Sequence, residues 1–102
     1  MKEIKWLAEN IRDELDDAEK YAKKALKWRD ASPELSQLAA NLAHQELNHA
    51  DMLHEQVVRL IKTQQQKGVD APPAMLAVWD WEHERMVEAV SKIRALLSSL
   101  TR

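Results

Sequence analysis

Three long stretches of the chain carry apolar side chains at intervals of three and four residues, which is the spacing of one buried face of an α-helix. The pattern predicts helices over about residues 2–29, 33–66 and 72–99. Pro33 and the pair Pro72-Pro73 favour helix starts, and Gly68, the only glycine, favours a helix end. No stretch alternates as a strand does. The sequence therefore predicts an all-α fold, a single domain over 1–102 made of three long antiparallel helices.

The first and third predicted helices each have one apolar stripe. In the first helix it comprises Ile4, Leu7, Ile11, Leu15, Ala18, Ala22, Ala25 and Trp28. In the third it comprises Met75, Leu76, Trp79, His83, Met86, Val90, Ile93 and Leu97. One histidine thus falls on the apolar face of the third helix.

The middle predicted helix carries two apolar stripes side by side. The leucine stripe comprises Leu35, Leu38, Leu42, Leu53, Val57 and Leu60. The alanine stripe comprises Ala40, Ala43, Leu47, Ala50, Val58 and Ile61. A helix this widely apolar contacts neighbours on more than one side. We expect the leucine stripe to be buried, and the middle helix to lie at the centre, against the other two helices and another subunit.

Glu46 and His49 stand where the leucine stripe would continue between Leu42 and Leu53. A carboxylate and an imidazole in an apolar interior are costly unless each has a polar partner. A shared metal ion is one such partner, because side chains three residues apart lie on one helix face. The alternative is a buried Glu–His pair hydrogen-bonded to a neighbour such as Tyr21.

Glu14 lies at the edge of the first helix's stripe, one heptad before Tyr21. Opposite Glu46 and His49 it would add a second carboxylate, and such a donor set suits iron, manganese or zinc. The alternative is a solvated glutamate at the rim. Asp17, one turn further on, is either a hydrogen-bonding partner behind the ligands or simply solvated.

The remaining histidines are weaker candidates. His83 is either a further ligand, a donor behind the ligands, or a core histidine with a polar partner. His54 points well away from His49 around the helix, so we expect a structural role for it. We expect His44 to be solvated or at an interface.

These residues make half of a dinuclear carboxylate site. Such a site in a four-helix bundle takes one Glu from each of two helices and a Glu-x-x-His motif from each of the other two. This chain offers one inward Glu and one inward Glu-x-x-His. Two copies related by a two-fold axis would complete both the site and a four-helix bundle, so the sequence predicts a homodimer or a higher homo-oligomer.

The segments ELDDAEKY, from Glu14 to Tyr21, and ELNHAD, from Glu46 to Asp51, resemble the first two helices of the ferritin-like superfamily, in particular its rubrerythrin branch. The similarity covers roughly residues 4–61. It implies that Glu14, Glu46 and His49 are iron ligands and that Tyr21 hydrogen-bonds near the site. The family's second helical pair is absent. The resemblance therefore implies either dimerisation, as in half-length ferritin-like proteins of encapsulated type, or an incomplete site.

Composition excludes several other classes of protein. The net charge of −2 gives no basic field for nucleic acid or an anionic membrane, and no apolar run is long enough to span a bilayer. The absence of cysteine excludes thiolate chemistry and the rubredoxin-like domain of rubrerythrins. The N-terminus has no signal-peptide core, so a cytoplasmic location is expected. The resemblance to small proteins of bacteria and their phages adds a phage origin or a protein compartment as settings.

The leading hypothesis is a ferritin-like metal-binding protein with a di-iron-type site between subunits, in which Mn or Zn could replace Fe. If active, it would oxidise Fe(II) as a ferroxidase or handle iron; the sequence leaves open whether it is an enzyme. The alternative is a non-catalytic helical structural or interaction module without bound metal. A third reading is a mononuclear site within one chain, formed by Glu14, Glu46, His49 and His83.

Overall fold

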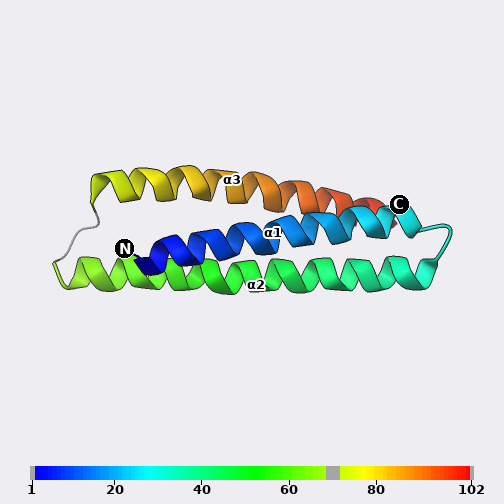
Figure 1. Cartoon of the computed structure of the whole chain (residues 1–102), viewed down its shortest axis with the longest axis horizontal. Coiled ribbons are helices and arrows are strands. Elements are labelled where there is room, and N and C mark those ends of the chain that lie inside the picture. Colours follow the sequence, from blue (N-terminus) through cyan, green and yellow to red (C-terminus); the bar gives the residue numbers. More distant parts are fainter. Residues whose placement is uncertain (1, 69–71, 102) are drawn as a thin grey trace.

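The computed structural model describes residues 2–68 and 72–101, and over these ranges it contains three long helices and no strand. Helix α1 spans Lys2–Trp28, α2 spans Pro33–Gln66 and α3 spans Pro73–Ser98, followed by the short 3-10 turn η1 at Ser99–Thr101. Consecutive helices run antiparallel along a rod of 56 × 19 × 18 Å, so α1 and α3 point in the same direction (Figure 1). The predicted all-α class and its three helices are confirmed, with ends within one residue of the prediction.

Proline and glycine set the helix ends as the sequence indicated. Pro33 and Pro73 are the first residues of α2 and α3, where the missing N–H costs no hydrogen bond. Gly68 follows the last turn of α2 with φ of +73°, a left-handed conformation that favours glycine. None of the described helices combines the length and apolarity needed to cross a membrane.

Helix α1 lies between the other two and packs against both (Figure 1). The prediction that the middle helix of the sequence is the central one is therefore wrong. The apolar stripe of α1 is buried along almost its whole length, at Ile4, Leu7, Ile11, Leu15, Ala18, Ala22 and Ala25. In the described chain, α2 and α3 share few close backbone approaches, because α1 stands between them.

Small residues form much of the contact between α1 and α2. The buried residues of α2 are Ser36, Ala39, Ala40, Ala43, Leu47, Ala50 and Val57. Small side chains on both helices permit a close approach of their axes, since the interaxial distance depends on the side chains at the contact. The Ser36 hydroxyl also donates to the carbonyl of Ala25 at 2.6 Å, in the last turn of α1, where carbonyls lack intrahelical partners.

The leucine stripe of α2 is turned away from α1. Leu35 and Leu38 are 44% and 53% exposed, and Leu42, Leu53 and Leu60 are half-buried. The prediction that this stripe forms a buried face is wrong for the single chain, although Val57 is buried. The cause is that the alanine stripe takes the contact with α1, and α3 lies on the other side of α1.

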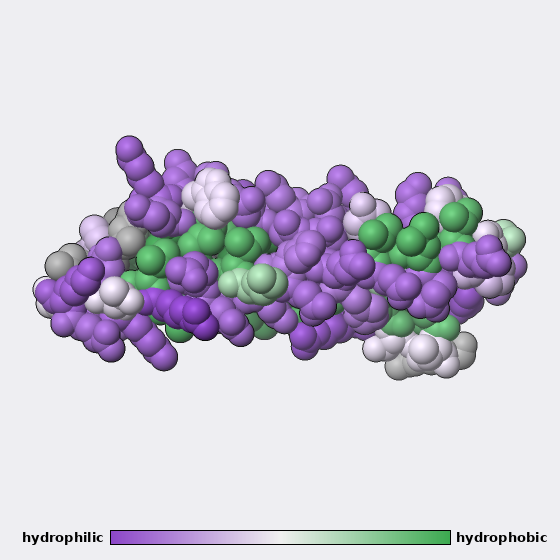
Figure 2. Space-filling model, turned by 90° about the horizontal axis from the view of Figure 1, so that it is seen from below, coloured by the Kyte–Doolittle hydropathy of each residue, from purple (hydrophilic) through white to green (hydrophobic). Residues whose placement is uncertain are grey.

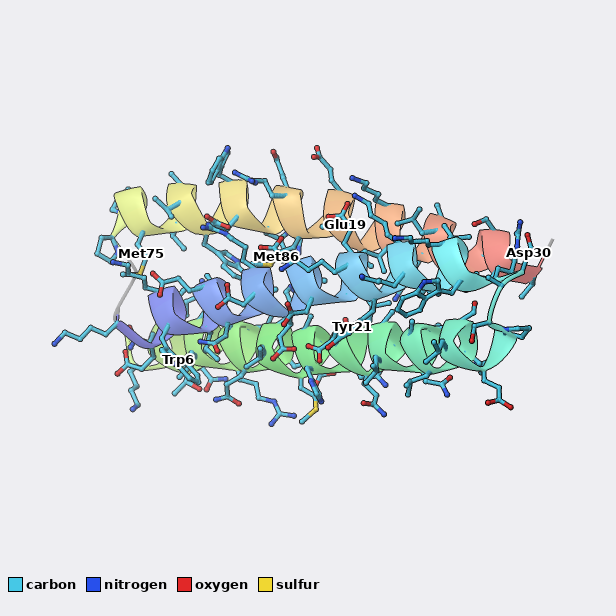
Figure 3. All side chains as sticks on the ribbon, turned by 45° about the vertical axis from the view of Figure 1, so that its right-hand side comes forward. Trp6, Glu19, Tyr21, Asp30, Met75 and Met86 are labelled. Atoms are coloured by element: carbon cyan, nitrogen blue, oxygen red, sulfur yellow. The ribbon has the colours of Figure 1, made fainter. Side chains whose placement is uncertain are left out.

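Two ion pairs join α1 to α3. Arg12 pairs with Glu82, a carboxylate of α3 that is almost completely buried. Lys92 of α3 pairs with Glu19 at 2.5 Å, and Figure 3 shows Glu19 between the two helices. The hydrogen bond from Lys92 lowers the pKa of the Glu19 carboxyl, and the charge of Lys23 acts in the same direction. Both pairs connect side chains of α1 and α3 across the helix–helix contact.

Candidate metal centre

Glu14 of α1 meets Glu46 and His49 of α2 half-way along the rod. His49 Nδ1 lies 3.5 Å from Glu14 Oε2 and 3.9 Å from Glu46 Oε2. One donor atom from each of the three residues lies within 4.8 Å of the other two. In residues 2–68 and 72–101 this is the one group of three or more Asp, Glu or His side chains gathered in this way. The structure thus brings together the three residues that the sequence predicted as ligands.

The packing of α1 on α2 explains why these side chains meet. Leu15, Leu47 and Ala50, which directly follow the three donors in the sequence, are all buried in this packing. Each donor residue therefore stands one position away from a buried one, at the edge of the same helix–helix contact. Because the helices are antiparallel, the middle of α1 faces the middle of α2, and the three donors reach a common point.

The group is open to solvent on one side. The side chains of Glu14 and Glu46 are 27% and 19% exposed, and that of His49 is 53% exposed. The expectation that these residues lie in a dry interior is therefore wrong for a single chain. The reason is that the alanine stripe of α2 takes the contact with α1, whereas Glu46 and His49 belong to the leucine stripe, which is turned away from α1.

Asp17 and Tyr21 lie further along the same side of α1. Both line a groove of about 350 Å³ between α1 and α2, together with Lys20, Lys24, Trp28, Leu35, Leu38, Ala39 and Leu42. Tyr21 is half-buried and points toward α2 (Figure 3), whereas Asp17 is exposed. The groove is part of the apolar surface of α2, because the exposed Leu35 and Leu38 also line it.

His83 lies elsewhere. Its ring stacks on that of His54 of α2, with centroids 5.1 Å apart, and lies tilted beside that of Trp79 of α3, with centroids 5.8 Å apart. It is not part of the group formed by Glu14, Glu46 and His49, so the four-residue site within one chain is not assembled in this structure.

The donor set has a definite chemical capability. Ionised carboxylates are acceptor-only groups, and an imidazole nitrogen is a ligand for iron, manganese and zinc alike. Three protein donors with one side open to solvent leave coordination positions for water or a substrate, as catalytic metal sites do.

Sequence reasoning missed the contacts across helices, among them those of Arg12 with Glu82 and of His54 with His83. Glu82 follows Trp79 by three residues and precedes Met86 by four, so its place on the buried face of α3 could have been read from the same periodicity. The stacking of His54 on His83 has no such local signal, because it joins two helices.

Comparison with protein-family models, curated proteins and solved structures finds no significant match for this chain. The resemblance to the ferritin-like superfamily therefore rests on the motifs of the sequence alone and stays a prediction.

Proposed function

We propose that this chain binds a divalent transition metal through Glu14, Glu46 and His49, and that two copies complete a paired, di-iron-type site. The observation that carries the proposal is the meeting of these three donors, from two helices, on the open side of the α1–α2 pair. The chain is then a small metal-binding protein of helical-bundle type, with iron as the favoured ion.

The distances within the group fit a metal ion. Ligand bonds of about 2.0–2.2 Å allow two donors on one ion to lie roughly 3–4.4 Å apart. The contacts from His49 Nδ1, at 3.5 and 3.9 Å, fall within that range. The widest separation in the group, up to 4.8 Å, needs only a small side-chain movement to close.

The surface around the donors supports a second copy as the partner. Figure 2 shows apolar areas near both ends of the α2 side, with a hydrophilic middle between them. On α2, Leu35 and Leu38 are exposed near one end, and Met52 is 69% exposed beyond the donors. A two-fold axis through the middle would set each apolar end against the opposite end of the other copy. It would also bring the two donor groups together.

The size of this face is adequate for a stable dimer. A face 56 Å long and 19 Å wide has a projected area of roughly 1,000 Å². That area is enough for the contribution of about 800 Å² that each partner makes to a standard protein–protein interface.

The residues then have separate roles. Glu14 and Glu46 supply negative charge and oxygen donors, which favour Fe(III) over Fe(II) and thereby the oxidation of bound Fe(II). His49 adds a neutral nitrogen ligand at the solvent side. If the metal is iron, Fe(II) is the substrate, and dioxygen or peroxide is the oxidant.

Metal stoichiometry tests the ligand assignment. Protein loaded anaerobically with Fe(II) should hold about one Fe(II) per chain, and Glu46→Ala should abolish this Fe(II) binding. Glu55→Ala is the matched control, because Glu55 is an exposed glutamate of the same helix. Wild-type protein that takes up neither Fe(II) nor Mn(II), or a Glu46→Ala variant that binds Fe(II) as wild type does, would overturn the assignment.

Light scattering tests the pairing. Leu38→Lys should convert a dimer to a monomer, because it places a charge on the proposed interface. Val87→Lys should not, although Val87 of α3 has the same 53% exposure as Leu38. A wild-type monomer at micromolar concentration, or equal behaviour of the two variants, would contradict the paired site.

The alternative, a helical interaction module without metal, draws on the same exposed leucines. It predicts a melting temperature that responds neither to EDTA nor to added iron, whereas an ion that binds only the folded state raises it.

A further inference from the structure

The stacked histidines His54 and His83 form a second group of metal donors, outside the proposed site and from another pair of helices. His54 belongs to α2 and His83 to α3, and both side chains are half-buried. Their rings lie 5.1 Å apart at 26° to one another. Trp79 flanks both, at 5.9 and 5.8 Å. Neither histidine contributes to the group of Glu14, Glu46 and His49.

We infer that His54 and His83 form a two-histidine site for a borderline divalent ion such as Zn²⁺, with Asp51 as the third ligand. Imidazole-rich sets favour zinc, copper and nickel, whereas the carboxylate-rich group at Glu14 favours iron and manganese. The site is independent of the proposed function.

The separation of the two rings carries the inference. Two imidazoles on one tetrahedral zinc have centroids about 5.2 Å apart, because each centroid lies about 3.2 Å from an ion bonded at about 2.1 Å. The centroids of His54 and His83 already lie 5.1 Å apart. The rings are stacked, so each must turn about its Cβ–Cγ bond to aim a nitrogen at the shared ion. That rotation leaves the centroid nearly in place.

Asp51 supplies the third donor. It precedes His54 by three residues, so the two side chains project from the same face of α2. Asp51, His54 and His83 line one cavity of about 300 Å³, together with Met86 of α3. An open cavity of that size leaves room for the carboxylate to swing toward the ion and for a water at the fourth position.

One positively charged side chain, which would repel a bound cation, also lines this cavity. Arg94 is the cation there, but it lies eleven residues beyond His83, about 16 Å along α3. The ion would therefore sit at the opposite end of the cavity from Arg94, between Asp51 and the two rings.

An ion bound by His54 and His83, here called the clamp, would connect two helices whose backbones otherwise share little contact. Helix α3 is held to the rod through α1, and its backbone approaches α2 closely at few positions. An ion on His54 and His83 would join α2 directly to α3 and close the three-helix unit. Structural zinc sites act in this way, because binding to the folded arrangement adds directly to its stability.

Zinc titration tests the inference in a background without the first site. In Glu14→Gln/Glu46→Gln protein, calorimetry with Zn²⁺ should still find one ion per chain. His54→Gln or His83→Gln should lower the affinity by about 100-fold or more, and Asp51→Asn by about 10-fold. His44→Gln should leave it unchanged, because His44 is an exposed histidine of the same helix. No binding in this background, or binding insensitive to both histidine variants, overturns the clamp.

A second measurement uses the unaltered chain. In ¹⁵N-histidine spectra, Zn²⁺ should shift the ring nitrogens of His54 and His83 while those of His44 stay in place. Shifts confined to His49 would locate the ion at the first site and refute the second. Because the background variant lacks both carboxylates of the first site, failure of one site is distinguishable from failure of the other.

Discussion

Removal of Arg12 should leave the buried carboxylate of Glu82 without its ion-pair partner in the contact between α1 and α3. The Glu82 side chain is 10% exposed, and Arg12, whose side chain is 49% exposed, pairs with it from α1. Arg12→Met keeps most of the aliphatic length and removes the charge. A buried polar group left without its partner costs about 1–3 kcal/mol. The half-exposed arginine places the loss below the 3–5 kcal/mol typical of fully buried pairs. We expect Arg12→Met to lower the free energy of unfolding by about 2 kcal/mol.

A double-mutant cycle separates the cost of leaving the Glu82 charge unpaired from the cost of losing the packing of the Arg12 side chain. Glu82→Leu removes the carboxylate, so Arg12→Met in that background should cost much less than in wild-type protein. The coupling energy should be about 1–2 kcal/mol, since the two residues are in contact. Arg59→Met is the matched control, because Arg59 is an exposed arginine of α2.

Urea unfolding followed by circular dichroism, at one fixed protein concentration, measures these values. An Arg12→Met variant within about 0.5 kcal/mol of wild type, the usual range for surface substitutions, would show that the pair is not desolvated. Equal losses from Arg12→Met with and without Glu82→Leu would refute the coupling.

Three further substitutions probe the fold itself, by the same urea assay. Ile93→Ala, at a side chain 1% exposed, should cost about 3 kcal/mol through the cavity it leaves. Ser36→Ala should cost about 1 kcal/mol, because it removes a buried hydrogen bond to the end of α1. Lys92 lowers the pKa of Glu19, so their pair stabilises the fold above the ordinary carboxyl pKa and ceases to do so as pH falls through the lowered value. Glu19→Gln should therefore cost about 0.5 kcal/mol at pH 7, and the cost should shrink as the pH falls below the ordinary carboxyl pKa. Glu84→Gln, at an exposed glutamate of α3, is the control and should cost almost nothing at either pH.

The helices were predictable because their signals are local. The apolar period of α1 and the positions of Pro33, Pro73 and Gly68 act within a few residues, and the structure places the helix ends accordingly. The pair Glu46 and His49 could likewise be found on one face, because residues three apart on a helix always share one.

The choice between the two stripes of α2 was not predictable in the same way. Both stripes have the same period, and the leucine stripe is the more hydrophobic. What decides is the partner: α1 presents Ala18, Ala22 and Ala25 at 0% exposure, and these residues fit the small side chains of Ala40 and Ala43. Complementarity of side-chain size between two helices cannot be predicted from the sequence of either helix alone.

Contacts between distant helices also exceed what a single sequence shows. Arg12 and Glu82 are seventy residues apart, and His54 and His83 meet only because α3 folds back over α1. The register of α3 is the result of packing along its whole length, so these pairs could be recognised only in the assembled bundle.

The exposure of the donor group changes the energetic argument for a metal. In an apolar interior, Glu46 and His49 would require a partner to offset desolvation. In the single chain His49 is 53% exposed, and water meets that need. A requirement for an ion arises only when a second copy covers the face and removes the water. Metal binding and pairing are then linked, since an ion that binds only the paired state must stabilise pairing by the same free energy. Separating the subunits with Leu38→Lys should thus weaken metal binding, although Leu38 is more than two helical turns from His49. If this variant is monomeric and still binds the metal as tightly as the dimer, the ion belongs to a single chain and the paired site is wrong.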